Sequence, residues 1–197
     1  MNFFNTRKSL LVAGFGSFPG QRTNPAEILT RRLERKKRVF ALAGIDLHTA
    51  VLPVDRFALS PTLSRLFAET SPDAVLLLGV AARRKRLTIE TLARNRASIL
   101  RPDAARQRPF CRFIVHGGPD VLHGSGAAPR LAALASRNGL PAALSHDAGD
   151  YLCNESFYLS LLMDRCACFI HVPNWRGARL ESAARVILSM AKDFALA

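Results

Sequence analysis

The sequence predicts a single α/β domain over residues 1–197, built on an open, twisted, mostly parallel sheet with helices on both faces. Short apolar runs alternate with segments of helical periodicity, which is the order of a sheet joined by helical crossovers. The runs are apolar throughout, as strands buried between two helical layers are. A chain of 197 residues, 49% of them hydrophobic, is long enough to form such a three-layer core.

The expected elements follow one another in alternation. The run SLLVAGF predicts a first buried strand, and Asn24-Pro25 predicts a helix start, because asparagine caps helices and proline suits the first turn. The unit 140–173 is expected to pair its two strands in parallel through a right-handed crossover. In chain order, strands are expected at 9–15, 45–53, 74–79, 113–115, 140–145 and 166–172, and helices from 24, at 58–69, behind Cys153, at 127–138 and at 180–194.

Cys153 and His171 are the candidate nucleophile and base. In the expected unit Cys153 opens a helix just after one strand, and His171 ends the next strand. Both would then lie at the sheet edge where open α/β folds place their chemistry. The helix dipole and a neighbouring imidazolium favour a cysteine thiolate. The pattern therefore indicates a cysteine hydrolase, although without a motif a buried cysteine is more often inert core.

The glycine-rich segment GFGSFPG follows the first strand. Its glycine spacing differs from that of the dinucleotide-binding fingerprint. Phe15 and Phe18 are two aromatic residues on a loop at the carboxyl end of a strand, which suits the wall of a small apolar pocket. Packing of the loop onto the core fits the same spacing, so both interpretations stay open.

The net charge of +13 fits either an acidic partner such as nucleic acid or a solubilising surface. The basic cluster 31–38 falls in a predicted helix with no interleaved aromatic residues, which favours a solvated face and makes nucleic acid an unlikely partner. No run reaches membrane-spanning length, and the amino terminus has no cleavage pattern. The four cysteines form no CxxC pair. A reducing cytoplasm is therefore expected, with no metal, no cofactor and no membrane partner.

The chain resembles the pyroglutamyl peptidase I family, the pyrrolidone carboxyl peptidases. The resemblance runs in order from about residue 9 to about residue 175. It implies the three-layer, phosphorylase/hydrolase-like form of the α/β fold. Five segments carry it: LLVAGFGSFPGQRTNP, Leu52-Pro53-Val54, GVAARRKRLTIETLARN from residue 79, AGDYLCN from residue 148 and FIHVP from residue 169.

The resemblance implies a thiol protease of the omega-peptidase class that hydrolyses the amide bond after an amino-terminal pyroglutamyl residue. It assigns Cys153 as nucleophile, His171 as base and Glu90 as the residue that orients the imidazole. Its substrates would be amino-terminally pyroglutamylated peptides. A homo-oligomer stays open, because members of the family are often tetramers. The lactam ring would lie against Phe15 and Phe18, with Tyr151 and Leu152 as further walls.

The sequence also departs from the family pattern. Ser17 and Pro19 replace a proline and a glycine of the opening motif, and Ala82-Arg83 replaces a Pro-Gly pair. Thr91 stands where the family has an arginine directly after its glutamate. A second hypothesis therefore keeps the fold and the hydrolytic cysteine but gives the enzyme another substrate or reduced turnover. A third, less favoured, is a basic nucleic-acid-binding protein.

Overall fold

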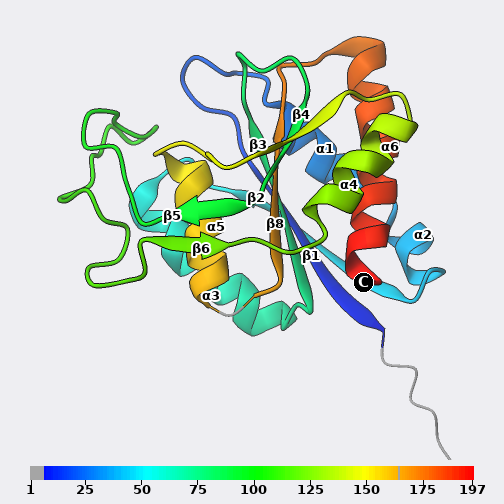
Figure 1. Cartoon of the computed structure of the whole chain (residues 1–197), viewed down its shortest axis with the longest axis horizontal. Helices are drawn as coiled ribbons and strands as arrows, with labels where there is room; N and C mark the ends of the chain where they lie inside the picture. Colours follow the sequence, from blue (N-terminus) through cyan, green and yellow to red (C-terminus); the bar gives the residue numbers. More distant parts are fainter. Residues whose placement is uncertain (1–6, 164) are drawn as a thin grey trace, which may run out of the picture.

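The computed structural model describes residues 7–163 and 165–197. Within these ranges the main sheet has six strands in the order β2-β1-β3-β8-β4-β7 (Figure 1). All neighbouring strands run parallel except β4 and β8, which are antiparallel. The strands are β1 (Lys8–Phe15), β2 (Ile45–Leu52), β3 (Ala74–Val80), β4 (Leu87–Glu90), β7 (Ala142–Ser145) and β8 (Ala167–Val172). The predicted α/β fold with a mostly parallel sheet is confirmed.

Helices cover both faces of the sheet (Figure 1). One face packs against α1 (Pro25–Glu34), α2 (Lys37–Ala41), α4 (Ala128–Arg137) and α6 (Gly177–Ala195). The other packs against α3 (Arg56–Thr70) and α5 (Leu152–Leu162), beside a small ladder of β5 (Leu92–Arg94) and β6 (Val121–His123). No helix in the described part of the chain is long and apolar enough to cross a membrane.

Alternating side chains of the strands supply the two cores. In β1, Leu10 and Val12 face α1 and α6, whereas Leu11 and Ala13 face α3 and α5. The strand is therefore apolar on both sides, which is why its sequence is a continuous hydrophobic run. The predicted cap of α1 is confirmed, because the Asn24 side chain accepts a hydrogen bond of 3.0 Å from the Ala26 N–H.

The parallel pairing expected within 140–173 is wrong. Strand β4 lies between β7 and β8, parallel to the first and antiparallel to the second. The expectation considered only strands that are consecutive in the chain, and β4 is a four-residue strand, LTIE, that follows a basic stretch without an apolar run. The short strand expected at 113–115 is also wrong, since Phe113 has no regular structure and the next two residues form a bend, and the β5–β6 ladder was not predicted.

Candidate active site

Glu90 and His171 lie on neighbouring antiparallel strands and face the same side of the sheet. Ile89 and Ile170 point to the α6 side, so Glu90 and His171 point to the α5 side. The His171 Nδ1 and Glu90 Oε1 atoms are 2.8 Å apart. Both residues are buried, with 5% and 1% of their surface exposed. The strand pairing thus builds a carboxylate–imidazole pair below α5.

Arg84 adds a cation to this pair. Its Nη1 donates to Glu90 Oε1, and its Nη2 donates to the Asp147 carbonyl at 2.9 Å. Burial by itself would raise the pKa of Glu90, but the hydrogen bond and charge of His171, together with the bond from Arg84, hold that pKa below its usual value. Glu90 is therefore a carboxylate at neutral pH although it is buried.

Cys153 is the second residue of α5 and lies over the same part of the sheet. Its Sγ atom is 2.8 Å from the position that a Cβ atom on Gly79 would occupy. Gly79 is the direct neighbour of His171 in the β3–β8 pairing. The sulfur therefore lies against β3, over the residue that pairs with His171, at a place left open by a glycine. In the sequence, Gly79 ends an expected strand and begins a segment that resembles the family, and its contact with Cys153 was not predicted.

The thiol of Cys153 is not activated in the way that the sequence suggested. Burial, and next the negative charge of Glu90, raise its pKa to about 12, against a smaller lowering by Arg84. The expectation of a thiolate counted the helix dipole and an imidazolium but omitted desolvation, which disfavours the charged form. At neutral pH the sulfur therefore keeps its proton until a base removes it.

Hydrogen bonds fix the first turn of α5. The Asn154 side chain accepts from the Arg94 N–H at 2.9 Å and donates to the carbonyls of Arg94 and Arg96 at 2.8 and 3.0 Å. The Tyr151 hydroxyl donates to the Pro102 carbonyl at 3.2 Å. These bonds connect the residues on either side of Cys153 to β5 and to the following loop, so the position of the thiol is well defined.

A small apolar cavity of about 60 Å³ opens at the Cys153 sulfur. It is lined by all four residues expected to form a pocket, together with three others. The Asn24 side-chain amide is already engaged, donating to the Gly16 carbonyl at 2.8 Å and accepting from Ala26. The sequence predicted Asn24 as a helix cap and as part of the opening segment that resembles the family, but not as a wall of the cavity. The lining residues are Phe15, Phe18, Asn24, Val54, Val80, Tyr151, Leu152 and Cys153 itself.

Comparison with known proteins decides the family. A family model described as pyroglutamyl peptidase matches residues 8–197. The chain belongs to the pyroglutamyl peptidase family. It is 34% identical over 170 residues to the pyrrolidone-carboxylate peptidase of Thermococcus onnurineus (strain NA1), covering 83% of this chain and 82% of that protein. A similar match, 32% identical over 170 residues, is to the pyrrolidone-carboxylate peptidase of Vibrio parahaemolyticus.

Solved structures agree with this assignment. The crystal structure of pyrrolidone carboxyl peptidase from Thermus thermophilus superposes with a TM-score of 0.81 at 35% identity, covering 92% of this chain and 97% of that one. A mutant of the Pyrococcus furiosus enzyme gives 0.86 at 26% identity, covering 95% and 98%. This pyroglutamyl peptidase family member is therefore a peptidase hydrolase with the family's fold.

In this pyroglutamyl peptidase family member, Thr91 stands where the family has an arginine, and its side chain makes local hydrogen bonds. Thr91 follows the end of β4, and its hydroxyl donates to the Ser145 carbonyl at 3.0 Å and contacts the exposed His146. Arg84, which matches an arginine of the family motif, supplies a positive charge beside Glu90. Neither Thr91 nor His146 lines the cavity at Cys153.

The remaining cysteines lie outside the site. Cys111 and Cys166 are exposed, and Cys168 points into the core on the α6 side of the sheet. Among the described residues, no group of three or more histidine, cysteine, aspartate or glutamate side chains could hold a metal ion.

Proposed function

We propose that this protein is a cysteine peptidase that releases pyroglutamate from the amino terminus of peptides, with Cys153 as nucleophile, His171 as base and Glu90 as the residue that orients the base. One set of observations carries the proposal: Glu90 and His171 form a buried pair, and the Cys153 thiol lies over Gly79, the β3 neighbour of His171, and lines a small apolar cavity. The family of the chain agrees with this assignment.

The cavity favours an uncharged ring. Phe15, Phe18, Val54 and Leu152 offer apolar surface, and transfer of a charged amine into such a site is costly. An ordinary amino-terminal residue carries an ammonium group at neutral pH, whereas a pyroglutamyl residue ends in a neutral lactam. Discrimination by desolvation therefore suits a peptidase that accepts only blocked, cyclised amino termini.

The reaction follows from the protonation states of the three residues. With His171 Nδ1 donating to Glu90, the neutral ring presents Nε2 as the acceptor. As the sulfur of Cys153 forms an S–C bond with the carbonyl carbon, the thiol proton passes to Nε2. The C–N bond then breaks, and the leaving amine takes that proton. Water next attacks the thioester with His171 as base, and the sulfur departs and is protonated again.

Glu90 has its largest effect when the imidazole is charged. The carboxylate stabilises the imidazolium that forms during each half-reaction and holds its ring orientation. The negative charge on the carbonyl oxygen needs hydrogen-bond donors as well. The first-turn N–H groups of α5 have no partners within the helix, and they include that of Cys153. They are the proposed oxyanion donors.

A fluorogenic assay tests the proposal. The wild-type protein should release aminocoumarin from pyroglutamyl-aminocoumarin but not from prolyl-aminocoumarin, whose five-membered ring carries an ammonium group. Cys153→Ala should abolish release, and Cys166→Ala, which changes an exposed cysteine outside the site, should leave it unchanged. Release that persists in Cys153→Ala would contradict the proposal. A wild-type protein without release, but with an alkylatable Cys153, would favour another substrate.

A further inference from the structure

A second, larger cavity adjoins the one at Cys153. It has a volume of about 400 Å³ and shares Phe18 and Tyr151 with the smaller cavity. The smaller cavity is far too small for a peptide, so most of a substrate must lie outside it. We propose that the larger cavity receives the residue that follows pyroglutamate, and that Arg101 in its wall makes acidic residues the preferred ones. This inference rests on the proposed function.

The only carboxylate in the wall of this cavity is fully engaged in hydrogen bonds. Asp103 Oδ2 accepts from the Arg56 N–H at 2.9 Å, and Oδ1 accepts from the Gln107 N–H at 2.8 Å. Asp103 is also buried, with 6% of its surface exposed. Both of its oxygens therefore already accept backbone hydrogen bonds that shape the loop, and little of the side chain is open to a ligand.

Arg101, in contrast to Asp103, is exposed and only weakly paired. Its side chain is 70% exposed, and its nearest acidic group, Asp150, lies at 3.6 Å, longer than a direct hydrogen bond. Such a loose surface pair is weak, so the guanidinium can exchange this partner for a carboxylate of the substrate at little cost. Of the two charged side chains in the wall of the second cavity, the cationic Arg101 is thus the exposed one and Asp103 the buried one.

The loop that carries Arg101 is attached to the walls of the first cavity. The Ala104 N–H donates to the Val54 carbonyl at 3.0 Å, and the Ser98 N–H donates to the Asp150 carbonyl at 2.7 Å. Val54 and Tyr151 both line the cavity at the nucleophile. The position of Arg101 relative to Cys153 is therefore set by backbone bonds on both sides of the loop.

The wider surroundings have the same sign of charge. Residues 83–112 contain ten arginines and lysines but only two acidic residues, Glu90 and Asp103, both buried. Arg84 and Arg96 of this stretch contact Glu90 and Asp147, which places it at the catalytic edge of the sheet. A positive rim of this kind raises the local concentration of acidic ligands and their rate of association. It adds to the preference expected from Arg101.

Matched peptides test the inference. Amidated pyroglutamyl-Glu-Gly, pyroglutamyl-Ala-Gly and pyroglutamyl-Lys-Gly differ only in the side chain after pyroglutamate, and released pyroglutamate gives kcat/KM for each. At low ionic strength the Glu peptide should exceed the Lys peptide by about tenfold, because an exposed ion pair gains a few-fold and a like charge loses as much. Added salt should reduce this ratio toward one.

Substitutions of Arg101 test whether this residue causes the preference for Glu over Lys after pyroglutamate. Arg101→Ala should reduce the Glu-to-Lys ratio to about twofold, Arg101→Glu should invert it, and Arg101→Lys should retain it. The ratio within one variant is independent of any loss in overall activity. Equal rates for the Glu and Lys peptides in the wild type, or a ratio that Arg101→Ala leaves unchanged, would overturn the inference.

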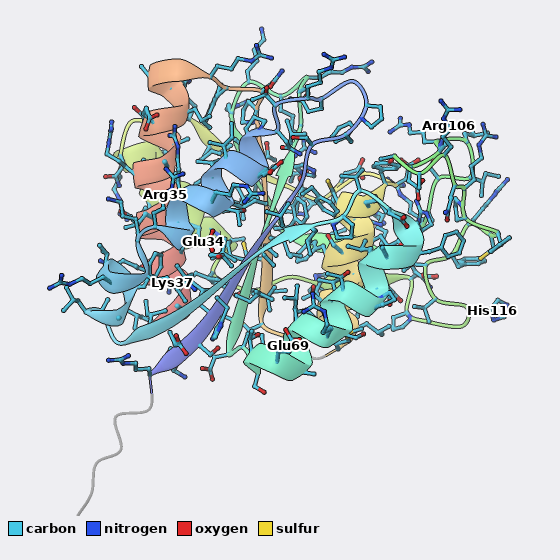
Figure 2. All side chains as sticks on the ribbon, turned by 180° about the vertical axis from the view of Figure 1, so that it is seen from behind. Glu34, Arg35, Lys37, Glu69, Arg106 and His116 are labelled. Carbon is cyan, nitrogen blue, oxygen red and sulfur yellow. The ribbon has the colours of Figure 1, made fainter. Side chains whose placement is uncertain are left out.

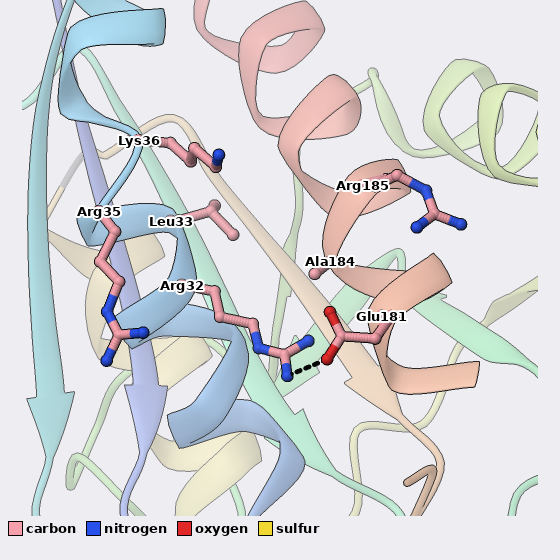
Figure 3. Close-up of a pocket in the computed structure, with 7 residues that line it drawn as sticks. All are labelled: Arg32, Leu33, Arg35, Lys36, Glu181, Ala184 and Arg185. Atoms are coloured by element: carbon pink, nitrogen blue, oxygen red, sulfur yellow. Dashed lines mark hydrogen bonds and ion pairs between the residues drawn. The ribbon is translucent and has the colours of Figure 1, made fainter. Parts of the chain in front are cut away.

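Arg35→Ala is the matched control. Arg35 lines a separate basic hollow of about 480 Å³ between α1 and α6, together with Arg32 and Glu181 (Figure 3). It lies across the molecule from the loop that carries Arg106 (Figure 2). Arg35→Ala removes the same charge and should leave the ratio unchanged. An equal fall in both variants would attribute the preference to net charge and overturn the role of the cavity. Failure on pyroglutamyl-aminocoumarin itself would instead refute the proposed function.

Discussion

The sulfur of Cys153 lies 2.8 Å from the position of a Cβ atom built on Gly79, so the proposed nucleophile occupies space that the side chain of any other residue at position 79 would fill. The same Cβ would lie 2.7 Å from the Phe169 ring. Gly79→Ala should therefore displace the thiol or the ring. We expect kcat/KM on pyroglutamyl-aminocoumarin to fall by at least about a hundredfold, because small misplacements of a reacting group are costly.

Two measurements separate this effect from general damage. Overpacking should lower the free energy of unfolding by about 1–3 kcal/mol, which urea denaturation can measure. Gly126→Ala is the control, since a Cβ there has no neighbour within 4 Å, and it should behave as wild type. Normal turnover by Gly79→Ala would mean that the thiol does not work from its position over β3.

Glu90→Gln should reduce kcat by about 10²–10⁴ while KM changes little, because the amide keeps the shape but cannot stabilise the imidazolium. The amide can also donate to Nδ1 and so favour the wrong tautomer of His171. Arg84 would lose its carboxylate partner as well. Glu181→Gln removes a carboxylate from an exposed ion pair with Arg32 and serves as the control. A kcat within threefold of wild type would exclude Glu90 from the proposed triad.

The raised pKa of Cys153, about 12, predicts how its alkylation depends on pH. Only the thiolate reacts with iodoacetamide, so the rate at Cys153 should climb by about tenfold per unit from about pH 7 to about pH 10 without a plateau. Peptide mass spectrometry follows Cys153 and the exposed Cys166 in one sample. A rate at Cys153 that is constant across this range would instead reveal a preformed thiolate–imidazolium pair.

The sequence allowed the helices and the long strands to be predicted because their residues carry the signal locally. The apolar runs of β1, β3 and β8 and the Asn24 cap were recognisable without any distant contact. Strand β4 was not recognisable in this way, because its four residues form a strand only by pairing with β7 and β8. The burial of Glu90 likewise depends on His171, 81 residues later in the chain.

The candidate site also has some features that local sequence predicts and others that only the folded structure shows. Motifs identified Cys153, His171 and the aromatic walls, since these residue types stand in a recognisable order. Desolvation of the thiol could not be predicted, because it depends on the complete packing of α5 onto the sheet. The contact over Gly79 and the cation supplied by Arg84 are also three-dimensional relationships. In the sequence, Gly79 and Arg84 were recognisable as members of the segment from residue 79 that resembles the family, but their contacts with Cys153 and Glu90 were not.

A buried ion pair joins α3 to the first turn of α5. Arg56, the first residue of α3, donates to Glu155, two residues after Cys153, and both are less than one tenth exposed. Burial raises the pKa of Glu155 to about 7, although the charge of Arg56 opposes the shift. Arg56→Ala removes that opposing charge, and we expect a loss of about 3–5 kcal/mol in the free energy of unfolding.

The double variant Arg56→Met, Glu155→Leu tests whether this loss comes from an uncompensated charge. Apolar residues of similar volume avoid the desolvation cost, so the double variant should recover most of the stability lost in Arg56→Ala. Urea denaturation of the single and double variants supplies the measurement. If the double variant were as unstable as Arg56→Ala or less stable, Arg56 would act through packing alone. Recovery would show instead that the pair contributes little net stability and serves to position the helix that carries Cys153.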